Sequence, residues 1–304
     1  MNHAPLAPLC AAALQATAQQ SMPAGTLYVV ATPIGNLADI TARALATLAR
    51  CDALAAEDTR VAAHLLQAYG IERKPLVRCD AHREHEAAAD IVSRLARGER
   101  VALVSDAGTP AVSDPGARVV QAVRAAGYGV VPLPGPSSVV TLLSAAGIDG
   151  TAFCFEGFVP GKASEVQQWL ARLATATHTT VVFEAPHRAH ATLTLLASAL
   201  APERRVVVGR ELTKRFETIA ALPARDLPQW LAANADHVAQ GELVLAIEAA
   251  AVQASDAGAH DALLHTLLAH VSVKTAATLA AEITGAPKNM LYERALQIRK
   301  APEQ

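Results

Sequence analysis

The chain has few cysteines, and no two of them stand at the spacing of a metal or redox site. It contains four, namely Cys10, Cys51, Cys79 and Cys154. Because they lie far apart and form no Cys-x-x-Cys pair, we expect reduced, mostly buried thiols in a cytoplasmic protein rather than a disulfide framework or a zinc site. The histidines are also scattered, and His82 with His85 lacks a convincing third ligand, so no metal is expected.

The chain also lacks a strong net charge and a long apolar run. Its net charge is -2 over 304 residues, which predicts no general attraction to nucleic acid or to an anionic membrane. Any site for a polyanion must therefore be a local patch. No uninterrupted apolar stretch approaches the roughly eighteen residues that cross a bilayer, so no membrane partner is expected. The composition is that of a globular protein long enough for two domains.

The first residues do not have the pattern of a secretory signal. No Lys or Arg precedes the apolar patch Leu9–Leu14, and prolines interrupt the segment. We therefore predict that residues 1–24 form a disordered tail rich in Ala, Pro and Gln.

Two phosphate-binding motifs are absent, GxGxxG and GxxxxGK[ST], which argues against a cradle for a pyrophosphate or triphosphate. Instead, three other motifs each follow a short apolar run: Thr-Pro-Ile-Gly-Asn at 32–36, Ser-Asp-Ala-Gly-Thr-Pro at 105–110 and Pro-Gly-Pro-Ser-Ser at 134–138. Such a run indicates a buried strand that ends in a loop. In open α/β sheets the loops at the carboxyl ends of the strands bind small ligands, here a cofactor without phosphate.

Strand and helix patterns alternate from residue 25 to residue 136, which predicts an N-terminal α/β domain with a parallel sheet. Its predicted helices span about 39–50, 61–69, 84–97 and 116–126. Residues 137–250 favour a second α/β domain, in which strands close together in the sequence predict a mixed sheet. The predicted strands lie at 179–184, 205–208, 217–221 and 243–249, and the helices at 164–174, 188–200 and 227–235.

The remainder of the chain has a different character. Residues 251–260 are poor in large apolar side chains and indicate a linker, whereas 261–304 indicate a helical segment. Gly285-Ala286-Pro287 separates two of its helices, as in a small helix-turn-helix.

The loop that begins at Ser105 carries two carboxylates of interest. Asp106 is expected to accept a hydrogen bond from a ribose hydroxyl or a cofactor amine. Asp114 either contacts the ligand in the same way or caps the helix that begins near Gly116. Gly108 allows a ligand to approach the backbone closely.

Several of these motifs together resemble a known family. They are Leu27–Thr41, Ala56–Arg60, Leu103–Pro110, Pro132–Ser137, Phe155–Phe158, Phe183–Arg188, Arg210–Lys214 and Gly241-Glu242. In combination they are similar to the ribosomal RNA small-subunit cytidine 2′-O-methyltransferases, members of the tetrapyrrole (precorrin) methylase superfamily. The resemblance covers about Gly25 to Leu296.

The resemblance implies an α/β fold of the tetrapyrrole-methylase type with the cofactor cleft between two domains. It also implies a homodimer that uses S-adenosylmethionine. The implied reaction methylates the ribose 2′-hydroxyl of a cytidine in the decoding region of small-subunit ribosomal RNA, as free RNA or in the assembled subunit. Carried over residue by residue, the cofactor contacts are Pro33, Asp106, Ala107, Gly108, Thr109, Ser113, Asp114, Ser137, Ser138, Leu212 and Thr213.

Methylation of a 2′-hydroxyl requires an aligned oxygen and a group that handles its proton or developing charge. Matching motif positions make Asp58, Glu184 and Lys214 the catalytic candidates, with His187 and Glu217 as further ones. Each has a structural alternative: Asp58 can pair with Arg60, His187 can cap a helix, and Lys214 can belong to the solvated surface. The candidates for RNA phosphate are Arg60, Arg188 and Lys162.

The chain departs from the family pattern in two places. Asp80 and Arg83 stand where a histidine and an asparagine are usual, which puts the role of that loop in doubt. Residues 163–168 are not basic, so the attraction of RNA phosphate should be weaker there or be supplied elsewhere.

Two other functions remain open at this point. One is methylation of a small, tetrapyrrole-like molecule by the same fold, and the other is a non-catalytic ribosome-assembly factor. Residues 273–277 and 287–292 resemble the tail of the RNA-modifying group, which a small-molecule enzyme would not need.

Overall fold

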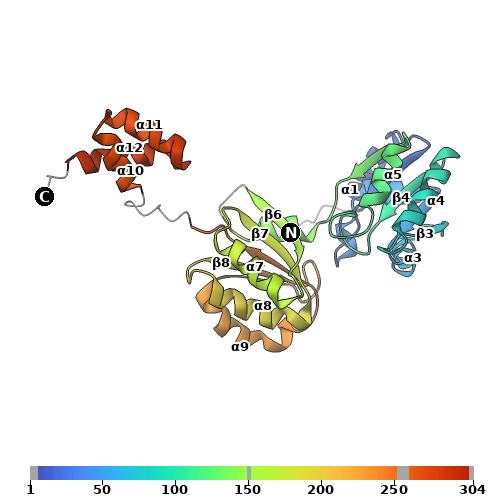
Figure 1. Cartoon of the computed structure of the whole chain (residues 1–304). Coiled ribbons are helices and arrows are strands. Elements are labelled where there is room, and N and C mark those ends of the chain that lie inside the picture. Colours follow the sequence, from blue (N-terminus) through green and yellow to red (C-terminus); the bar gives the residue numbers. More distant parts are fainter. Residues whose placement is uncertain (1–5, 149–151, 252–259, 301–304) are drawn as a thin grey trace. The chain divides into compact units, whose positions relative to one another are not determined.

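The computed structural model describes residues 6–148, 152–251 and 260–300 (Figure 1). The chain divides into two compact units. One contains residues up to 174 together with 178–248, and the other contains 175–177 and the residues after 248. The first unit holds two five-stranded sheets, and the second holds the C-terminal helices.

The first sheet is parallel throughout, as the alternating pattern predicts. Its strands are β1 Thr26–Val30, β2 Ala53–Ala56, β3 Leu76–Arg78, β4 Arg100–Val104 and β5 Gly129–Leu133, in the order β3-β2-β4-β1-β5. Successive β1 residues join different hydrophobic clusters: Leu27 packs with Ile91 and Val123, and Tyr28 packs with Leu48 and Leu66. Helices therefore cover both faces, as a parallel sheet requires. They are α2 Ala42–Arg50, α3 Thr59–Ala68, α4 Glu84–Ala96 and α5 Ala117–Ala125, with the short 3₁₀ helix η1 Leu37–Asp39 before α2.

The register of the central strands brings the three sequence motifs to one edge. Val29 lies opposite Leu103, and Val30 lies opposite Leu133, so β1, β4 and β5 end at the same level. Beyond the strands, Thr32 and Gly108 exchange two backbone hydrogen bonds of 2.9 and 3.0 Å. The Thr109 hydroxyl donates to the carbonyl of Pro136 at 3.0 Å. The predicted convergence of these loops is confirmed.

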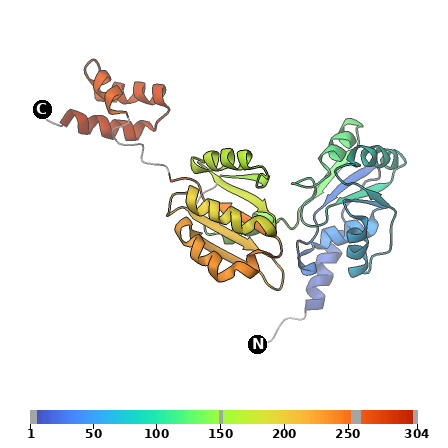
Figure 2. The ribbon, with the colours of Figure 1, turned by 60° about the horizontal axis from the view of Figure 1, so that its bottom comes forward.

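The second sheet is mixed, as expected. Its strands are β6 Phe153–Phe158, β7 Thr179–Glu184, β8 Arg205–Arg210, β9 Thr218–Pro223 and β10 Leu243–Ile247, in the order β6-β7-β10-β8-β9. The pair β6 and β7 is parallel, and the other pairs are antiparallel. Five helical segments accompany it: α6 Ser138–Ala145, α7 Ala163–Ala174, α8 Pro186–Ala199, η2 Ala224–Asp226 and α9 Leu227–Val238 (Figure 2).

Side chains from different helices cover the two faces of the second sheet. Trp169, Leu193 and Leu231 of α7, α8 and α9 pack in one cluster with strand residues such as Val208. Leu142 of α6 packs on the opposite face in a cluster that includes Val181, Val207 and Val244.

Three helices form the C-terminal unit: α10 Asp261–Leu268, α11 Val273–Thr284 and α12 Lys288–Lys300. The Ser272 hydroxyl caps α11 by accepting from the backbone N–H of Thr275 at 3.2 Å. Gly285 ends the helix in the left-handed conformation, with φ 71°. Arg294 and Asp261 join α12 to α10 through a 2.6 Å ion pair. The predicted helical segment with its turn at Gly285 is confirmed.

The prediction of a disordered tail is wrong for part of the N-terminal segment. Helix α1 spans Leu6–Ala18, where leucine and alanine, both strong helix formers, predominate. Arg50 of α2 donates to the carbonyl of Thr17 at 3.2 Å and so ties the end of α1 to the first sheet's helices.

Other elements were not predicted from the sequence, namely β3, α6 and β6. The predicted linker falls largely on residues 252–259, which lie outside the described residues.

The described cysteines are free thiols, in agreement with the sequence analysis. Cys51 and Cys79 are buried and Cys154 is partly buried, whereas the side chain of Cys10 lies outside the described residues. Burial raises the pKa of Cys51 to about 12 and that of Cys79 to about 11.

Within the described part of the chain, no helix is both long and apolar enough to cross a membrane.

Candidate functional site

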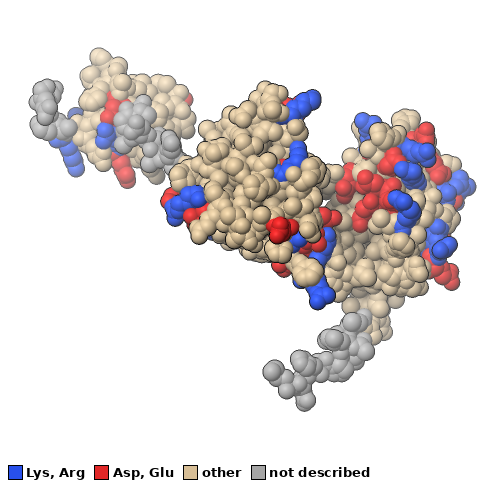
Figure 3. Space-filling model, turned by 90° about the horizontal axis from the view of Figure 1, so that it is seen from below, with Lys and Arg blue, Asp and Glu red and all other residues tan. Residues whose placement is uncertain are grey.

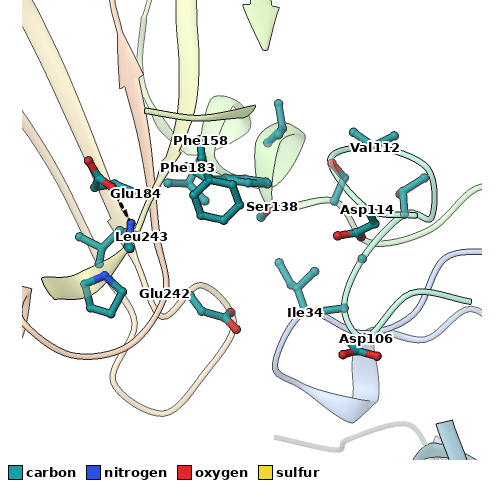
Figure 4. Close-up of a pocket in the computed structure, with 18 residues that line it drawn as sticks. Ile34, Asp106, Val112, Asp114, Ser138, Phe158, Phe183, Glu184, Glu242 and Leu243 are labelled. Carbon is teal, nitrogen blue, oxygen red and sulfur yellow. Dashed lines mark hydrogen bonds between the residues drawn. The ribbon is translucent and has the colours of Figure 1, made fainter. Parts of the chain in front are cut away.

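A cavity of about 410 Å³ lies at the carboxyl edge of the first sheet, and residues from both sheets line it. A cavity of this size suits a small organic ligand. Figure 4 shows the two groups facing each other, with Ile34, Asp106, Val112 and Asp114 opposite Glu184, Glu242 and Leu243. We call the first group, together with residues 107–109 and 137–139, the loop wall. The second group, with Phe158, Phe183, Ala185, Pro186 and Val244, is the strand wall.

Hydrogen bonds between side chains and the backbone hold the loop wall in place. The Ser105 hydroxyl lies 3.2 Å from the carbonyls of both Ala107 and Gly108, and so closes the turn that follows β4. The Asp106 carboxylate accepts a 3.1 Å hydrogen bond from the backbone N–H of Asp58. The loops after β2 and β4 are therefore joined through Asp106.

The backbone is strained at two residues that flank members of the loop wall. Ala111 and Ser113 have φ of 65° and 67°, which L-residues other than Gly, Asn and Asp rarely adopt. The alternate residues, Val112 and Asp114, line the cavity. Strain of this kind is concentrated at functional sites, where the surrounding structure enforces it. Ser113 itself does not line the cavity.

Asp114 does not cap helix α5. The first turn of α5 is capped instead by the buried carboxylate of Glu84, at the start of α4, which accepts from the N–H groups of Gly116 and Arg118 at 2.9 and 2.8 Å. Of the two alternatives that the sequence left open for Asp114, the helix cap is therefore wrong, and contact with a ligand stays a prediction. Its carboxylate is available to the cavity because another residue satisfies the helix terminus.

Carboxylates crowd the edge of the first sheet. Burial raises the pKa of Glu57 above its ordinary value, and repulsion by Asp106, Asp114 and two further aspartates adds to the effect. Burial likewise raises the pKa of Asp114, an effect that the Ser105 hydroxyl opposes and Asp106 reinforces. In Figure 3, acidic side chains gather on one part of the right-hand lobe, with basic side chains beside them. The close carboxylates of Glu57, Asp106 and Asp114 favour a cationic ligand.

The strand wall combines aromatic rings with a buried ion pair. The carboxylate of Glu184, at the end of β7, is buried and accepts from Arg188 at 2.6 Å and from the N–H of Ala185 at 2.7 Å, and it also accepts from the Thr192 hydroxyl. The Arg188 guanidinium donates in addition to the carbonyls of Val159 and Pro160 at 2.7 and 3.1 Å. This network fixes the ends of β6 and β7.

Lys214 lies in the β8–β9 loop beside the strand wall. Its ammonium donates to Glu211 at 2.9 Å and to Glu242, a cavity residue, at 3.1 Å. Burial opposes the charge on Lys214, but the hydrogen bonds to the two carboxylates outweigh it and raise the pKa of the ammonium. A Cβ on Gly35 would collide with the Lys214 side chain, so the glycine allows the loop after β1 to pack against it. Lys214 is thus a fixed cation that contacts the cavity residue Glu242, although it does not itself line the cavity.

The β8–β9 loop is strained in the same way as the loop wall. Glu211 and Thr213 have φ of 50° and 65°. Leu212 between them is buried in the core under the cavity. The Thr213 hydroxyl is buried and finds no hydrogen-bond partner among the described residues.

The cavity gathers most of the predicted cofactor residues but not all of them. Asp106, Ala107, Gly108, Thr109, Asp114, Ser137 and Ser138 line it, as does the catalytic candidate Glu184. The predicted contacts Pro33, Ser113, Leu212 and Thr213 do not line it. Several lining residues were not singled out from the sequence, namely Ile34, Val112, Val139, Phe158, Phe183, Ala185, Pro186, Glu242, Leu243 and Val244. Six of them lie within the motifs that carry the family resemblance, and membership of these motifs was the sequence signal that could have identified them. They are Ile34, Phe158, Phe183, Ala185, Pro186 and Glu242.

The other candidates take structural or exposed positions. Asp58 caps α3 and pairs with Arg60 at 2.6 Å, and these hydrogen bonds hold the pKa of Asp58 well below its usual range. The Arg60 side chain is 86% exposed. Lys162 is 80% exposed and pairs with Glu165. His187 and Glu217 are exposed, and neither lines the cavity, although Glu217 accepts from the backbone N–H of Thr213 at 2.6 Å. Across the described ranges, no group of three or more His, Cys, Asp or Glu side chains could hold a metal ion.

Comparison with known proteins shows the class of protein that this fold and site represent. A family described as tetrapyrrole (corrin/porphyrin) methylases matches residues 26–228, and an RsmI C-terminal helix-turn-helix domain matches residues 254–299. Two solved structures share the fold: the methyltransferase CobJ, with a TM-score of 0.56 and 22% identity, and cobalt precorrin-4 methyltransferase CbiF, with 0.55 and 20%. Each match covers 75% of this chain, and 95% and 98% of the other chains.

Curated relatives are much more similar in sequence. A protein of Neisseria meningitidis serogroup B is 48% identical over 92% of this chain and 96% of its own. One of Pseudomonas aeruginosa is 46% identical over 91% of this chain and 98% of its own. Both are named ribosomal RNA small subunit methyltransferase I. The chain belongs to the tetrapyrrole methylase family, in the group of these relatives.

The Glu184 network generates a test of stability. Replacing Glu184 with Ala leaves the Arg188 guanidinium, which is 29% exposed, without its anion. We expect E184A to lower the free energy of unfolding by about 3 kcal/mol, measured by urea denaturation. The exposed pair of Lys162 and Glu165 provides the control, since E165A should cost less than about 1 kcal/mol. Equal losses of unfolding free energy in the two variants would contradict the conclusion that the buried Glu184–Arg188 ion pair stabilises the fold.

Proposed function

We propose that this protein is an S-adenosylmethionine-dependent methyltransferase that methylates the ribose 2′-hydroxyl of a cytidine in the decoding region of small-subunit ribosomal RNA. The observation that carries this proposal is the cavity with a carboxylate-rich loop wall facing an aromatic strand wall. The relatives named ribosomal RNA small subunit methyltransferase I, which match over almost the whole chain, indicate the substrate.

The residues of the loop wall fit the methyl donor. Asp106 and Asp114 present carboxylates that suit the positive charge and ribose hydroxyls of S-adenosylmethionine, and Ser137 and Ser138 add hydroxyl groups. The backbone at Gly108, with φ 79°, lies at the cavity surface without a side chain in the way. When bound, the donor would supply the methyl group of its sulfonium, with the neutral thioether S-adenosylhomocysteine as the leaving group. No phosphate cradle is required, in keeping with the motifs absent from the sequence.

The protein must align the attacking oxygen and balance its charge. An ordinary lysine is already charged at neutral pH, and the raised pKa of Lys214 makes its charge more secure, so it does not act as a base but can stabilise a developing alkoxide. Glu242, the cavity partner of Lys214, is the carboxylate that we assign to accept the hydroxyl proton. Asp58 and Glu184 are held by structural contacts, so we assign them to positioning.

RNA contacts, assembly and location complete the proposal. Arg60 and Lys162 are exposed cations in the first unit, whereas Arg188 is held in the Glu184 network. In the C-terminal unit, Lys274 and Lys288 are exposed on the helix-turn-helix and suit RNA phosphate.

The protein acts as a cytoplasmic homodimer on ribosomal RNA, either free or in the assembled small subunit.

The reaction itself is the first test. The full chain is incubated with methyl-labelled S-adenosylmethionine and either small ribosomal subunits that lack the modification or free small-subunit RNA. We expect label on a ribose oxygen of a cytidine in the decoding region, located by mass spectrometry of RNA fragments. Label on a base, or transfer only to a porphyrin-like compound, would refute the proposed substrate. Failure to bind S-adenosylmethionine in calorimetry would favour a non-catalytic assembly factor.

The crowded carboxylates make binding of the donor depend on pH. Asp114 has a raised pKa, so acid removes its charge at a higher pH than for an ordinary aspartate. We expect the affinity for cationic S-adenosylmethionine to fall more steeply than that for the uncharged thioether S-adenosylhomocysteine as the pH drops from about 8 to about 5. Calorimetry with both ligands measures the ratio of their affinities.

Two variants identify the group responsible. Asp114→Asn should flatten the pH dependence of the affinity ratio and weaken S-adenosylmethionine binding by about tenfold at neutral pH. Asp236→Asn, an exposed change on α9, should leave the ratio and its pH dependence as in the wild type. A ratio that is constant with pH in the wild type would remove Asp114 from the cation site.

A further inference from the structure

Strand β6 carries an irregularity beside the cavity. Its pairing with β7 runs in register from Phe153 to Phe155, and Phe155 lies opposite Val181. The next pair is Phe158 with Phe183, so three steps along β6 match two steps along β7. One extra residue is therefore inserted, as in a β-bulge. Gly157 within the bulge has φ 74°, a conformation that favours glycine.

The bulge changes which side chains share a face. In a regular strand, residues two apart point the same way, so Phe155 would share its face with Gly157. Because of the extra residue, the rings of Phe155 and Phe158 both meet Phe183 edge to face. Their centroids lie 4.8 and 5.5 Å from that of Phe183, with interplanar angles of 61° and 68°. The bulge thus builds a three-ring cluster at the end of β6.

The three rings differ in their exposure. Phe155 and Phe183 pack against the buried cluster under α6, which supports them from behind. Phe158 is 58% exposed and lines the cavity. In Figure 4 the rings of Phe158 and Phe183 lie on the side opposite Asp106 and Asp114. An exposed ring that a rigid aromatic cluster supports, at the mouth of a polar cavity, is a preorganised surface for a planar group.

We propose that Phe158 is the stacking surface for the target pyrimidine base, an inference that rests on the proposed function. A ribose hydroxyl inside the cavity is accessible only if its nucleotide leaves the base stack. An aromatic side chain can replace the lost stacking, whichever base is presented. Phe158 stands on the same wall as Glu242, the partner of Lys214, whereas the groups that suit the methyl donor lie across the cavity. The base therefore lies on the strand wall and the donor on the loop wall.

Variants at Phe158 and a matched control test this assignment. Phe158→Ala removes the ring, Phe158→Leu retains apolar packing without a stacking face, and Phe158→Tyr retains the ring. Phe153→Ala is the control, since Phe153 lies at the other end of the same strand, is 50% exposed and lines a separate cavity. Each full-length variant is assayed for kcat and KM with unmodified small subunits, for S-adenosylhomocysteine affinity by calorimetry, and for thermal unfolding.

We expect Phe158→Ala and Phe158→Leu to lower kcat/KM for the RNA substrate by about tenfold or more, with S-adenosylhomocysteine affinity within about twofold of wild type. Phe153→Ala should retain wild-type kcat/KM, and Phe158→Tyr, which keeps a stacking face, should lose much less activity than Phe158→Leu. If Phe158→Leu matches the wild type, the ring only packs, and the inference is overturned. If donor affinity falls while the RNA parameters do not, the ring holds the adenine of the donor instead, which also overturns it. A wild-type protein that transfers no methyl group to RNA refutes the proposed function itself, and the inference with it.

Discussion

The parallel register of β1, β4 and β5 is the constraint on which the site depends. These strands end at one level, and the paired backbones of Thr32 and Gly108 then hold the loops of β1 and β4 together. The Thr109 hydroxyl adds the loop after β5 through its hydrogen bond to Pro136. The loop wall is therefore built from segments that are far apart in the sequence, and backbone groups take part in each of the hydrogen bonds that hold it. The side chains of Asp106 and Asp114 line the cavity, although Asp106 also accepts from the backbone N–H of Asp58.

The charges at the cavity are unbalanced in a way that fits the proposed reaction. Burial raises the pKa of Glu57 and of Asp114, and repulsion between the neighbouring carboxylates raises both further, which favours a cationic ligand. On the other side, Lys214 is the cation, held by Glu211 and Glu242. The positive charge of the methyl donor would face the carboxylates of the loop wall, and the negative charge that develops on the attacking oxygen would face Lys214. The strained residues in both loops show that the surrounding fold, and not local preference, fixes these positions.

The sequence predicted the parallel first sheet, the mixed second sheet and the motif loops, because short apolar runs that end in Gly, Pro, Ser or Asp are a local signal. It could not predict features that depend on distant partners. The cap of α5 comes from Glu84, which lies 32 positions from Gly116 in the sequence, so Asp114 was left between two roles. The register shift that turns Phe158 toward Phe183 is set by pairing with β7 and leaves no local trace except Gly157. Likewise, motif matching alone did not reveal that Leu212 belongs to the core or that Arg188 is held by Glu184.

The central claim is that the loop wall and the strand wall enclose the same ligand. Hydrogen–deuterium exchange of the full chain, with and without S-adenosylhomocysteine, tests it directly. We expect the ligand to slow exchange both in residues 106–114, which follow a strand of the first sheet, and in residues 238–244, which lead into a strand of the second sheet, because both segments contribute lining residues to the cavity. Protection confined to one of these segments would contradict a shared site.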